Sequence, residues 1–256
     1  MIVGTLDLDG QGTDGEITKH QSQIRNLNMH EPLVITIDGP AGAGKSTVAQ
    51  MVAKRLGLTY VDSGATYRAM ALRVLRAGVD PNDAQAVARL VGDADVQVAT
   101  GDGEPRVLVD GEDVTASLRT PEVTLAAAQV SRLPEVRAKL IEIQRAFARG
   151  PGVVMEGRDI GTVVFPQAQL KIFLKADVEE RARRRLKQDS RDSREATLEM
   201  TAYEIGRRDQ LDAERKISPL IPAPDAVEID STDLLADQVV EQILTLGYNR
   251  QLVRND

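Results

Sequence analysis

The chain has 256 residues, of which 42% are hydrophobic, and this length suits one α/β domain that carries an inserted module. The net charge of −7 and an aromatic content of 3% without Trp argue against nucleic-acid polymers, which bind to basic surfaces and stacking side chains. Cysteine is absent and no apolar run approaches the ~20 residues of a membrane span, so we expect a cytoplasmic protein without a membrane partner.

The first 29 residues are rich in Gly, Asp, Gln and Thr, and their apolar residues follow neither the period of a strand nor that of a helix. We expect residues 1–29 to form a disordered extension. The two histidines, His20 and His30, both precede the first predicted strand, where a solvated role is expected. A histidine-based metal site or catalytic triad is therefore not expected.

A phosphate-binding loop motif follows the first predicted strand. The apolar run Leu33–Ile37 leads into Gly39–Ser46, which reads Gly-Pro-Ala-Gly-Ala-Gly-Lys-Ser and matches G-x-x-x-x-G-K-[ST]. A helical pattern comes next, with apolar residues at Val48, Met51, Val52 and Leu56. A strand, a glycine-rich turn and a helix N-terminus in this order bind phosphate through backbone amides and the helix dipole.

The motif predicts a nucleoside triphosphate bound together with Mg²⁺. In such loops the lysine, here Lys45, reaches the β- and γ-phosphates, and the hydroxyl of Ser46 ligates the metal. The alternative is a glycine-rich turn with an exposed lysine. The expected triphosphate-binding residues are Gly39, Pro40, Ala41, Gly42, Ala43, Gly44, Lys45, Ser46 and Thr47.

Residues 62–150 separate a second predicted strand, Leu58–Val61, from a third, Val153–Met155. The segment contains two short apolar runs and an Asp110-Gly111 turn, which together predict a small antiparallel sheet from Val96–Ala99, Arg106–Val109 and the chain up to Val114. Because 89 residues are long for a connection, we interpret 62–150 as an inserted substrate module.

Two helices are expected in the second half of this insert. One begins at Thr120-Pro121-Glu122, and the other begins at Pro134 and stops at Gly150-Pro151. The apolar face of the second helix consists of Val136, Leu140, Ile143 and Phe147.

Apolar runs at Leu170–Leu174 and Ala226–Ile229 complete a set of five short strands. Continuous apolar runs are typical of parallel strands that are buried on both faces. Helical segments alternate with them, one starting at Asp177 with Glu180 three residues later and one over about 234–246. We therefore predict a doubly wound, three-layer α/β core of 30–61, 151–184 and 208–256, with ligands at the carboxyl ends of the strands.

Residues 185–207 are polar and densely charged. They include Lys187, Asp189, Arg191, Asp192, Arg194 and Glu195. This composition fits either a solvated helix-turn-helix or a short helical lid that closes over the phosphates, and the sequence leaves both open.

Phosphoryl transfer requires cationic groups around a loose transition state, so arginines near strand ends and lid borders indicate this chemistry. Arg68 follows the second strand, Arg158 follows the third, and Arg215 lies beyond the lid. Each alone would more often be a surface cation. Glu156 ends the third strand and is placed to hold Mg²⁺ through water, or else to cap a chain end. The expected catalytic residues are Lys45, Arg158, Arg184, Arg185 and Arg208.

The chain from Pro32 to Asn249 resembles the bacterial cytidylate kinases, which belong to the nucleoside monophosphate (NMP) kinase group of P-loop kinases. The resemblance is carried by Ile35-Thr-Ile-Asp-Gly-Pro-Ala-Gly-Ala-Gly-Lys-Ser, Asp62-Ser-Gly-Ala-Thr-Tyr-Arg, Gly157-Arg-Asp-Ile-Gly-Thr-Val-Val-Phe-Pro, Lys171-Ile-Phe-Leu, Arg207-Arg-Asp and Pro219-Leu. It implies Mg²⁺-dependent transfer of the ATP γ-phosphate to CMP or dCMP and an NMP-binding role for the insert 62–150. We also expect a monomer.

The resemblance also implies roles for individual residues. Four would surround the cytosine: Ser63, Arg137, Asp159 and Arg215. Arg68, Arg158 and Arg208 would lie near the acceptor phosphate or ribose, and Asp212 near the ribose hydroxyls. Cytosine presents an amino donor beside two acceptors, which suits a carboxylate next to guanidinium donors. Uracil would place an oxygen against the carboxylate, so we expect CMP to be preferred over UMP.

One position departs from the family pattern. A serine is expected on the helix before Pro134, where this chain has Ala128. Ser131, one turn later, is a candidate for the missing contact.

Two other functions remain open from the sequence. One is a P-loop kinase for another small acceptor, such as a shikimate- or gluconate-type metabolite, and the other is a regulatory nucleotide-binding switch. The N-K-x-D motif of GTPase switches is absent from the chain. A phosphate acceptor has a second pKa of about 6, so it is largely a dianion at neutral pH and needs no general base.

Overall fold

A computed structural model describes residues 31–99, 105–189, 197–215 and 217–253. The predicted extension 1–29, both histidines and the central part of the predicted lid lie outside these ranges. Among the described helices, none combines the length and the apolar character needed to cross a bilayer.

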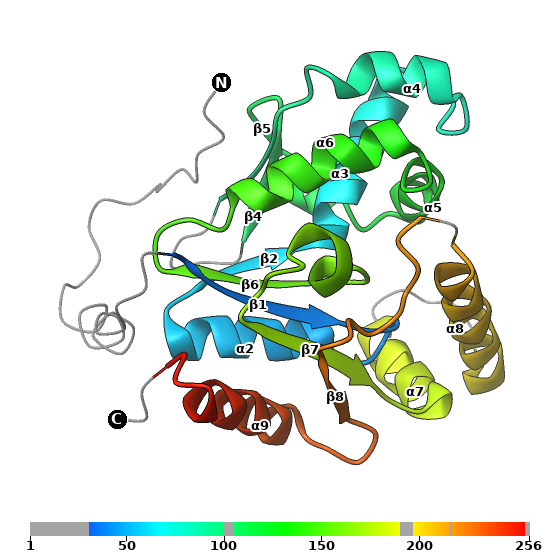
Figure 1. Ribbon diagram of the computed structural model, residues 1–256. Coiled ribbons are helices and arrows are strands. Elements are labelled where there is room, and N and C mark those ends of the chain that lie inside the picture. The colour runs from blue at the N-terminus through cyan, green and yellow to red at the C-terminus, as the bar shows by residue number, and fades with distance from the viewer. Residues whose placement is uncertain (1–30, 100–104, 190–196, 216, 254–256) are drawn as a thin grey trace.

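A five-stranded parallel sheet forms the centre of the protein, in the order β2-β6-β1-β7-β8 (Figure 1). The strands are β1 (Leu33–Asp38), β2 (Thr59–Asp62), β6 (Gly152–Gly157), β7 (Leu170–Lys175) and β8 (Val227–Asp230). All five predicted strands are confirmed, each to within two residues at either end. β1 is the middle strand, and its last residue, Asp38, is paired with Gly157 at the end of β6.

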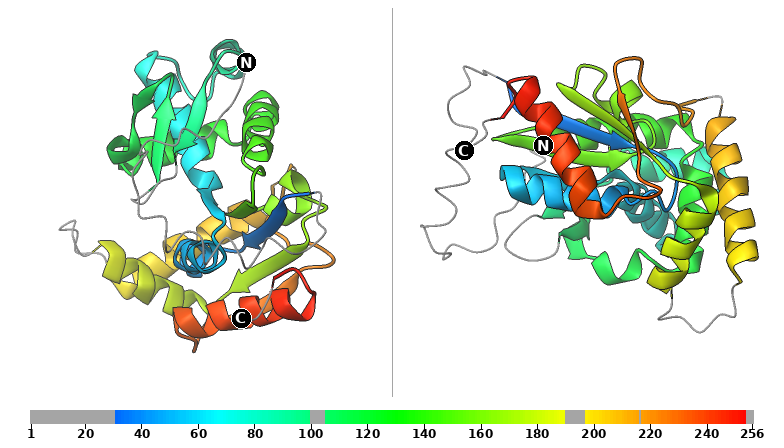
Figure 2. Two further views of the ribbon diagram at one scale, coloured as in Figure 1. Left: turned by 90° about the vertical axis from the view of Figure 1, so that its left-hand side faces the viewer. Right: turned by 90° about the horizontal axis from the view of Figure 1, so that it is seen from below.

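Helices cover both faces of this sheet, as the doubly wound prediction requires (Figures 1 and 2). Side chains alternate along each strand. Leu33, Ile35 and Ile37 of β1 therefore pack with α2 (Lys45–Leu56) and α9 (Ala236–Asn249). Val34 of β1 belongs to the other core, with α3 (Ser63–Arg76) and α6 (Pro134–Ala146).

The insert 62–150 contains the predicted antiparallel sheet and more helices than expected. Its strands are β3 (Val96–Ala99), β4 (Arg106–Val109) and β5 (Glu112–Asp113), in the order β3-β4-β5. Asp110 and Gly111 have φ values of 50° and 85°, and two positive φ values characterise a type I′ hairpin turn. The remaining elements are α4 (Ala84–Val91), a 3₁₀ turn (Thr115–Ser117) and α5 (Pro121–Val130).

Two helices of the insert, α3 and α4, were not predicted. α3 begins directly at the end of β2, and the side chain of Asp62 caps it by accepting a hydrogen bond from the Ala65 amide at 3.2 Å. No loop residues separate the strand from the helix, so the sequence carries no turn signal at this boundary. The insert rises from one side of the sheet (Figure 2, left).

The segment around the predicted lid is formed by α7 (Val178–Asp189) and α8 (Leu198–Ala213), which lie side by side (Figure 1). α8 continues without a break past residue 207, where we had placed the end of the lid. A further unpredicted element is a π-helical turn, Ile160–Val164, which follows β6.

Gly152 allows β6 to begin close to β1, and this contact generates a prediction for stability. Its φ is 127°, and an added Cβ would lie 2.0 Å from the carbonyl oxygen of Leu33. We expect Gly152→Ala to lower the free energy of unfolding by about 2–3 kcal/mol in chemical denaturation, because the backbone must move or strain. Gly92→Ala is the matched control, since Gly92 has a helical φ of −58° and no atom within 4 Å of an added Cβ. Equal losses in the two variants would contradict this interpretation.

Candidate active site

The phosphate loop connects β1 to α2 at the carboxyl edge of the sheet (Figure 1). Gly39 opens it with a φ of 149°, and an added Cβ would lie 2.0 Å from the backbone oxygen of Leu174 in β7. The loop therefore passes so close to the neighbouring strand that only glycine fits at its first position. The rest of the loop leads into α2, which begins at Lys45.

Lys45 is buried inside this loop, with 6% of its surface exposed. Its ammonium group donates to the carbonyl oxygen of Pro40 at 2.8 Å and lies 4.0 Å from a carboxylate oxygen of Glu156. Burial and the nearby charge of Arg158 lower the pKa of Lys45, while Glu156 and other carboxylates oppose this shift. A bound polyphosphate would favour the charged ammonium.

Glu156 ends β6 next to the phosphate loop and accepts two hydroxyl hydrogen bonds. The donors are Ser46, at the start of α2, and Tyr60, whose hydroxyl lies 3.3 Å from the same carboxylate oxygen. Burial, and then the charge of Asp62, raises the pKa of Glu156, whereas Lys45 and Ser46 lower it. Thr47, beside Ser46, is exposed.

The oxygen groups of Ser46 and Glu156 fit a hard divalent cation. Mg²⁺ prefers oxygen ligands and is commonly held by one or two protein groups, with phosphate oxygens and waters completing its shell. Within the described ranges no group of three or more His, Cys, Asp or Glu residues is arranged to hold a metal ion. Any magnesium at this loop would therefore depend on the phosphates for most of its ligands.

A buried ion pair joins Arg137 of α6 to Asp159, which follows β6. Both residues are less than 10% exposed, and the guanidinium also donates to the hydroxyl of Ser218 at 2.6 Å. The Arg137 guanidinium lies 5.8 Å from the centre of the Tyr67 ring. A carboxylate, guanidinium donors and an aromatic ring thus meet in one place. Ser63 is also buried, at the point where α3 leaves β2.

A second charged cluster surrounds Asp212 of α8. This carboxylate is 3% exposed and accepts from Arg158 at 3.1 Å and from Arg215 at 2.5 Å. Desolvation, together with the charges of Arg158, Arg185 and Arg215, lowers the pKa of the Arg208 guanidinium. Arg158, Arg208 and Arg215 therefore lie near one carboxylate, and Arg185 lies near enough to act on Arg208, an arrangement that attracts an anion.

Arg68 and Arg184 lie apart from this cluster. Arg68 pairs with Asp62 at 2.7 Å, and its buried Nε has no hydrogen-bond partner among the described residues. The Arg184 guanidinium instead donates to backbone oxygens of Ser231, at 2.6 Å, and of Ala43 in the phosphate loop, at 3.4 Å. Its neighbour Arg185 acts instead on Arg208 through its charge, whereas Arg184 is hydrogen-bonded to the phosphate loop.

Ser131 is not placed to supply the contact that was expected from a serine at position 128. The Ser131 hydroxyl donates to the carbonyl oxygen of Ala128 itself, at 3.0 Å, at the C-terminus of α5.

The sequence did not indicate several residues that shape the site. Arg181 is buried and donates to the Ala41 carbonyl of the phosphate loop at 3.2 Å, but it stands among four closely spaced arginines that look alike. Ser218 has a φ of 55° and lies next to the Pro219-Leu motif, which was the only signal for it. Asp38 and Tyr67 lie within the family motifs, but the sequence alone indicated no role for either residue.

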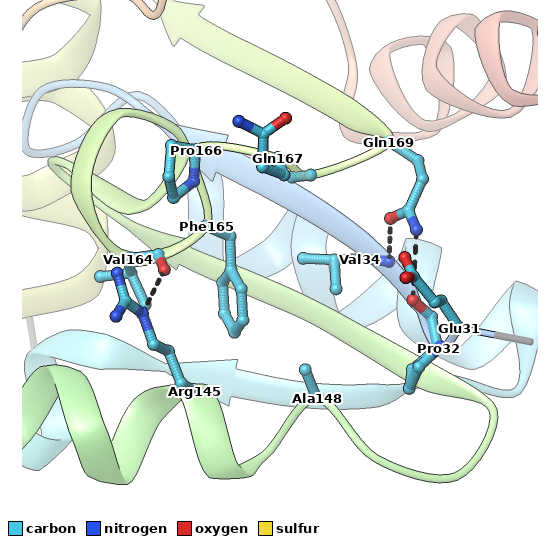
Figure 3. Close-up of a pocket in the computed structure, with 11 residues that line it drawn as sticks. Glu31, Pro32, Val34, Arg145, Ala148, Val164, Phe165, Pro166, Gln167 and Gln169 are labelled. Carbon is cyan, nitrogen blue, oxygen red and sulfur yellow. Dashed lines mark hydrogen bonds between the residues drawn. The ribbon is translucent and has the colours of Figure 1, made fainter.

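A hollow of about 380 Å³ lies at the opposite edge of the sheet, where β1 and β7 begin (Figure 3). Val34 and Phe165 lie between Arg145 and Gln169 in this view. Arg145 donates to the Val164 carbonyl at 2.8 Å, and Gln169 accepts from the Val34 amide at 2.8 Å. Ligands of parallel α/β sheets bind at the carboxyl ends of the strands, so this hollow is not the candidate active site.

The family model and the curated relatives point to one family. Residues 35–249 match the family model described as cytidylate kinase. A cytidylate kinase of Symbiobacterium thermophilum is 50% identical over 213 residues, which is 83% of this chain and 94% of that protein. One of Geobacillus kaustophilus is 50% identical over 222 residues, which is 87% of this chain and 99% of that protein. Among solved structures, a shikimate kinase from Acinetobacter baumannii has a TM-score of 0.42 at 17% identity over 86% of this chain and 96% of that one, too distant a likeness to bear on function.

The buried position of Asp212 generates a prediction for stability. Asp212→Asn removes the charge between Arg158 and Arg215, so we expect the free energy of unfolding to fall by about 2–4 kcal/mol in urea denaturation. Glu241→Gln is the control, because Glu241 pairs with Arg55 at 3.1 Å with both side chains more than half exposed. Such a surface pair contributes about 1 kcal/mol or less. If Asp212→Asn lowers the free energy of unfolding no more than the control does, the charge of Asp212 does not stabilise the cluster.

Proposed function

The chain belongs to the cytidylate kinase family, and on that basis we propose that it transfers the γ-phosphate of ATP to CMP or dCMP, giving ADP and CDP or dCDP. The observation that carries this proposal is the buried Arg137–Asp159 pair, which lies at the same edge of the sheet as the phosphate loop. The same edge therefore has groups suited to a polyphosphate and groups suited to a base, and transfer of phosphate from one nucleotide to another needs both.

On the donor side, the loop 39–46 holds the triphosphate. Its backbone amides and the N-terminus of α2 bind phosphate oxygens, and Lys45 neutralises charge on the β- and γ-phosphates. Ser46 and, through water, Glu156 are the residues that would hold Mg²⁺. When bound, the ion neutralises the charge that develops on the transferred group. The position of Lys45, held by the Pro40 carbonyl at 2.8 Å, supports this role.

On the acceptor side, Asp159 accepts the cytosine amino group, and Arg137 donates to the acceptor edge of the base. The carboxylate and the guanidinium already contact each other, so the pair presents both kinds of group side by side. Ser63 and Arg215 complete the surroundings of the base. A uracil would leave two oxygen acceptors facing each other, which costs about 1–3 kcal/mol per lost hydrogen bond.

The acceptor phosphate lies among arginines in this proposal. Arg68, Arg158 and Arg208 bind it, and Asp212 contacts the ribose. The Nε of Arg68, which has no hydrogen-bond partner among the described residues, and the mutual repulsion of the arginines near Arg208 support the binding of an anion. Phosphoryl transfer then relies on positioning and charge, since the CMP phosphate is already a nucleophilic dianion near neutral pH.

Closure and assembly remain part of the proposal. We propose that residues 185–207 act as a lid and that Arg184, Arg185 and Arg208 move with it to exclude water from the γ-phosphate. The segment 62–150 serves as the NMP-binding insert. We further propose a monomer, and a cytoplasmic location because the sequence contains no cysteine.

An acceptor screen tests the reaction itself. We expect the purified protein with Mg²⁺-ATP to form ADP rapidly with CMP and dCMP, and at least tenfold more slowly with UMP at subsaturating concentrations, because the base edge is read by charged groups. Shikimate and gluconate serve as negative controls in the same coupled assay. Rapid turnover with either control would indicate another small-acceptor kinase, and no turnover with any acceptor would indicate a nucleotide-binding switch.

The base-reading role of Asp159 has its own test. We expect Asp159→Asn to lower kcat/KM for CMP by roughly 100-fold and to reduce the CMP-to-UMP preference, with the KM for ATP little changed. The reason is that the amide presents a donor where the cytosine amino group needs an acceptor. The assay is steady-state ADP formation with each nucleotide. An unchanged CMP-to-UMP ratio would mean that Asp159 serves the fold alone.

A further inference from the structure

Asp38 is a buried carboxylate with no assigned role, at the end of β1 and one residue before the phosphate loop. It is 5% exposed. One carboxylate oxygen accepts from the Ile160 amide at 2.9 Å, and the other accepts from the Gly161 amide at 2.7 Å. Both carboxylate oxygens of Asp38 therefore bind backbone amides of the segment that follows β6.

These bonds leave a bridge of two residues held at both ends. At one end, Gly157 is paired with Asp38 in the register of the sheet. At the other end, the amides of Ile160 and Gly161 bind the Asp38 side chain. The two residues between these anchors are Arg158 and Asp159, which the proposed function places at the acceptor phosphate and at the base.

Tight packing beneath the bridge explains why glycine stands at both ends. A Cβ on Gly157 would lie 2.5 Å from the Ser63 hydroxyl, and a Cβ on Gly161 would lie 2.9 Å from the Thr36 hydroxyl and 3.3 Å from an Asp38 oxygen. The amide of Gly161 can approach the carboxylate only because no side chain intervenes. The spacing Gly157-Arg-Asp-Ile-Gly161 thus has a steric reason.

We propose that Asp38 is a positioning residue for phosphoryl transfer: by holding the Ile160 and Gly161 amides, it fixes Arg158 and Asp159 relative to the phosphate loop that begins at Gly39. This inference rests on the proposed function of Arg158 and Asp159. Asp38 directly precedes Gly39 of the phosphate loop, and its side chain binds the segment that carries Arg158 and Asp159. The same residue therefore positions both the donor site and the acceptor site.

The charge of Asp38 gives the proposal a signature in pH. Burial raises the pKa of Asp38 to about 6, and the repulsion of Asp159 adds to this, whereas the two amide bonds and the charge of Lys45 lower it. Lys171, from β7, also lies near this turn. A protonated carboxyl group has one oxygen that donates, so it no longer accepts both amides. Acidification should therefore loosen the bridge in the wild-type protein.

Asp38→Asn reproduces the neutral group at every pH, because its amide offers one acceptor and one donor. We expect calorimetry at about pH 7.5 to show CMP binding weakened about tenfold relative to wild type, with ATP binding changed less than about twofold. As the pH falls to about 5, the ratio of the two CMP dissociation constants should fall below about two, because the wild type gains its proton. Taking the ratio cancels the titration of CMP itself.

Thr36→Val is the matched control. Thr36 lies on the same face of β1 two residues earlier, and its buried hydroxyl has no hydrogen-bond partner among the described residues. We expect its CMP dissociation constant to stay within about twofold of wild type at both pH values. An Asp38→Asn ratio that does not change with pH, or equal losses of CMP and ATP binding, would overturn the proposal.

Two further measurements separate the remaining outcomes. If Asp38→Asn does not fold, the wild-type amide proton shifts of Ile160 and Gly161 in NMR should titrate together with a midpoint near 6, and flat shifts would overturn the proposal. Turnover of CMP by the wild type distinguishes the two claims. A wild type that phosphorylates CMP while Asp38→Asn binds CMP normally refutes the role of Asp38 alone, whereas a wild type inactive with CMP refutes the proposed function as well.

Discussion

The parallel pairing of β1 with β6 is the constraint on which the site depends. In a parallel pair both strands end at the same edge of the sheet, and here Asp38 and Gly157 are register partners. β1 continues into the phosphate loop, and β6 continues into Arg158 and Asp159. Two segments more than 100 residues apart in the sequence are thereby placed side by side by the backbone hydrogen bonds of the strand pair, and the Asp38 side chain adds two further bonds. The insert then adds Arg137 to this edge, α8 adds Asp212, and the chain between α8 and β8 adds Ser218.

Burial of charge gives this edge its chemical character. An isolated buried charge is costly, so each one here is paired or hydrogen-bonded, as Lys45 is to the Pro40 carbonyl and Asp38 is to two amides. The cluster around Asp212 differs, because several arginines lie near one carboxylate. Desolvation, and then the charge of Arg158, lowers the pKa of Arg208, whereas Asp212 raises it. A phosphate in this cluster would supply the missing negative charge.

The sequence predicted the parts of the fold that follow from local patterns. Runs of mostly apolar residues located all five strands of the sheet. The Asp110-Gly111 pair located the hairpin, because positive φ at both positions restricts which residues fit. It missed α3, which starts at the end of β2 without a turn, and the π-helical turn after β6, which depends on Asp38 reaching across from another strand. The continuation of α8 past residue 207 was also missed, since its polar composition gave no periodic signal.

The sequence proposed residues for the candidate site, but it could not indicate which of them contact one another. The family resemblance implied Asp159 and Arg137, but nothing local could show that they contact each other or that Ser218 joins them. Arg184 and Arg185 are adjacent and look equivalent in the sequence, but successive helix positions point about 100° apart. Arg184 therefore donates a hydrogen bond to the Ala43 carbonyl, whereas the charge of Arg185 acts on Arg208. Such distinctions require the packing of α7 against the loop and against α8.

The central claim is that a donor nucleotide and an acceptor nucleotide meet at this one edge. The most direct measurement is a crystal structure with a bisubstrate analogue in which adenosine and cytidine are joined through a chain of phosphates. The account predicts phosphates on the loop 39–46 and the cytosine amino group against Asp159, with Arg158 on the phosphate chain between them. A cytosine bound away from the Arg137–Asp159 pair, or phosphates that do not contact the loop, would contradict it.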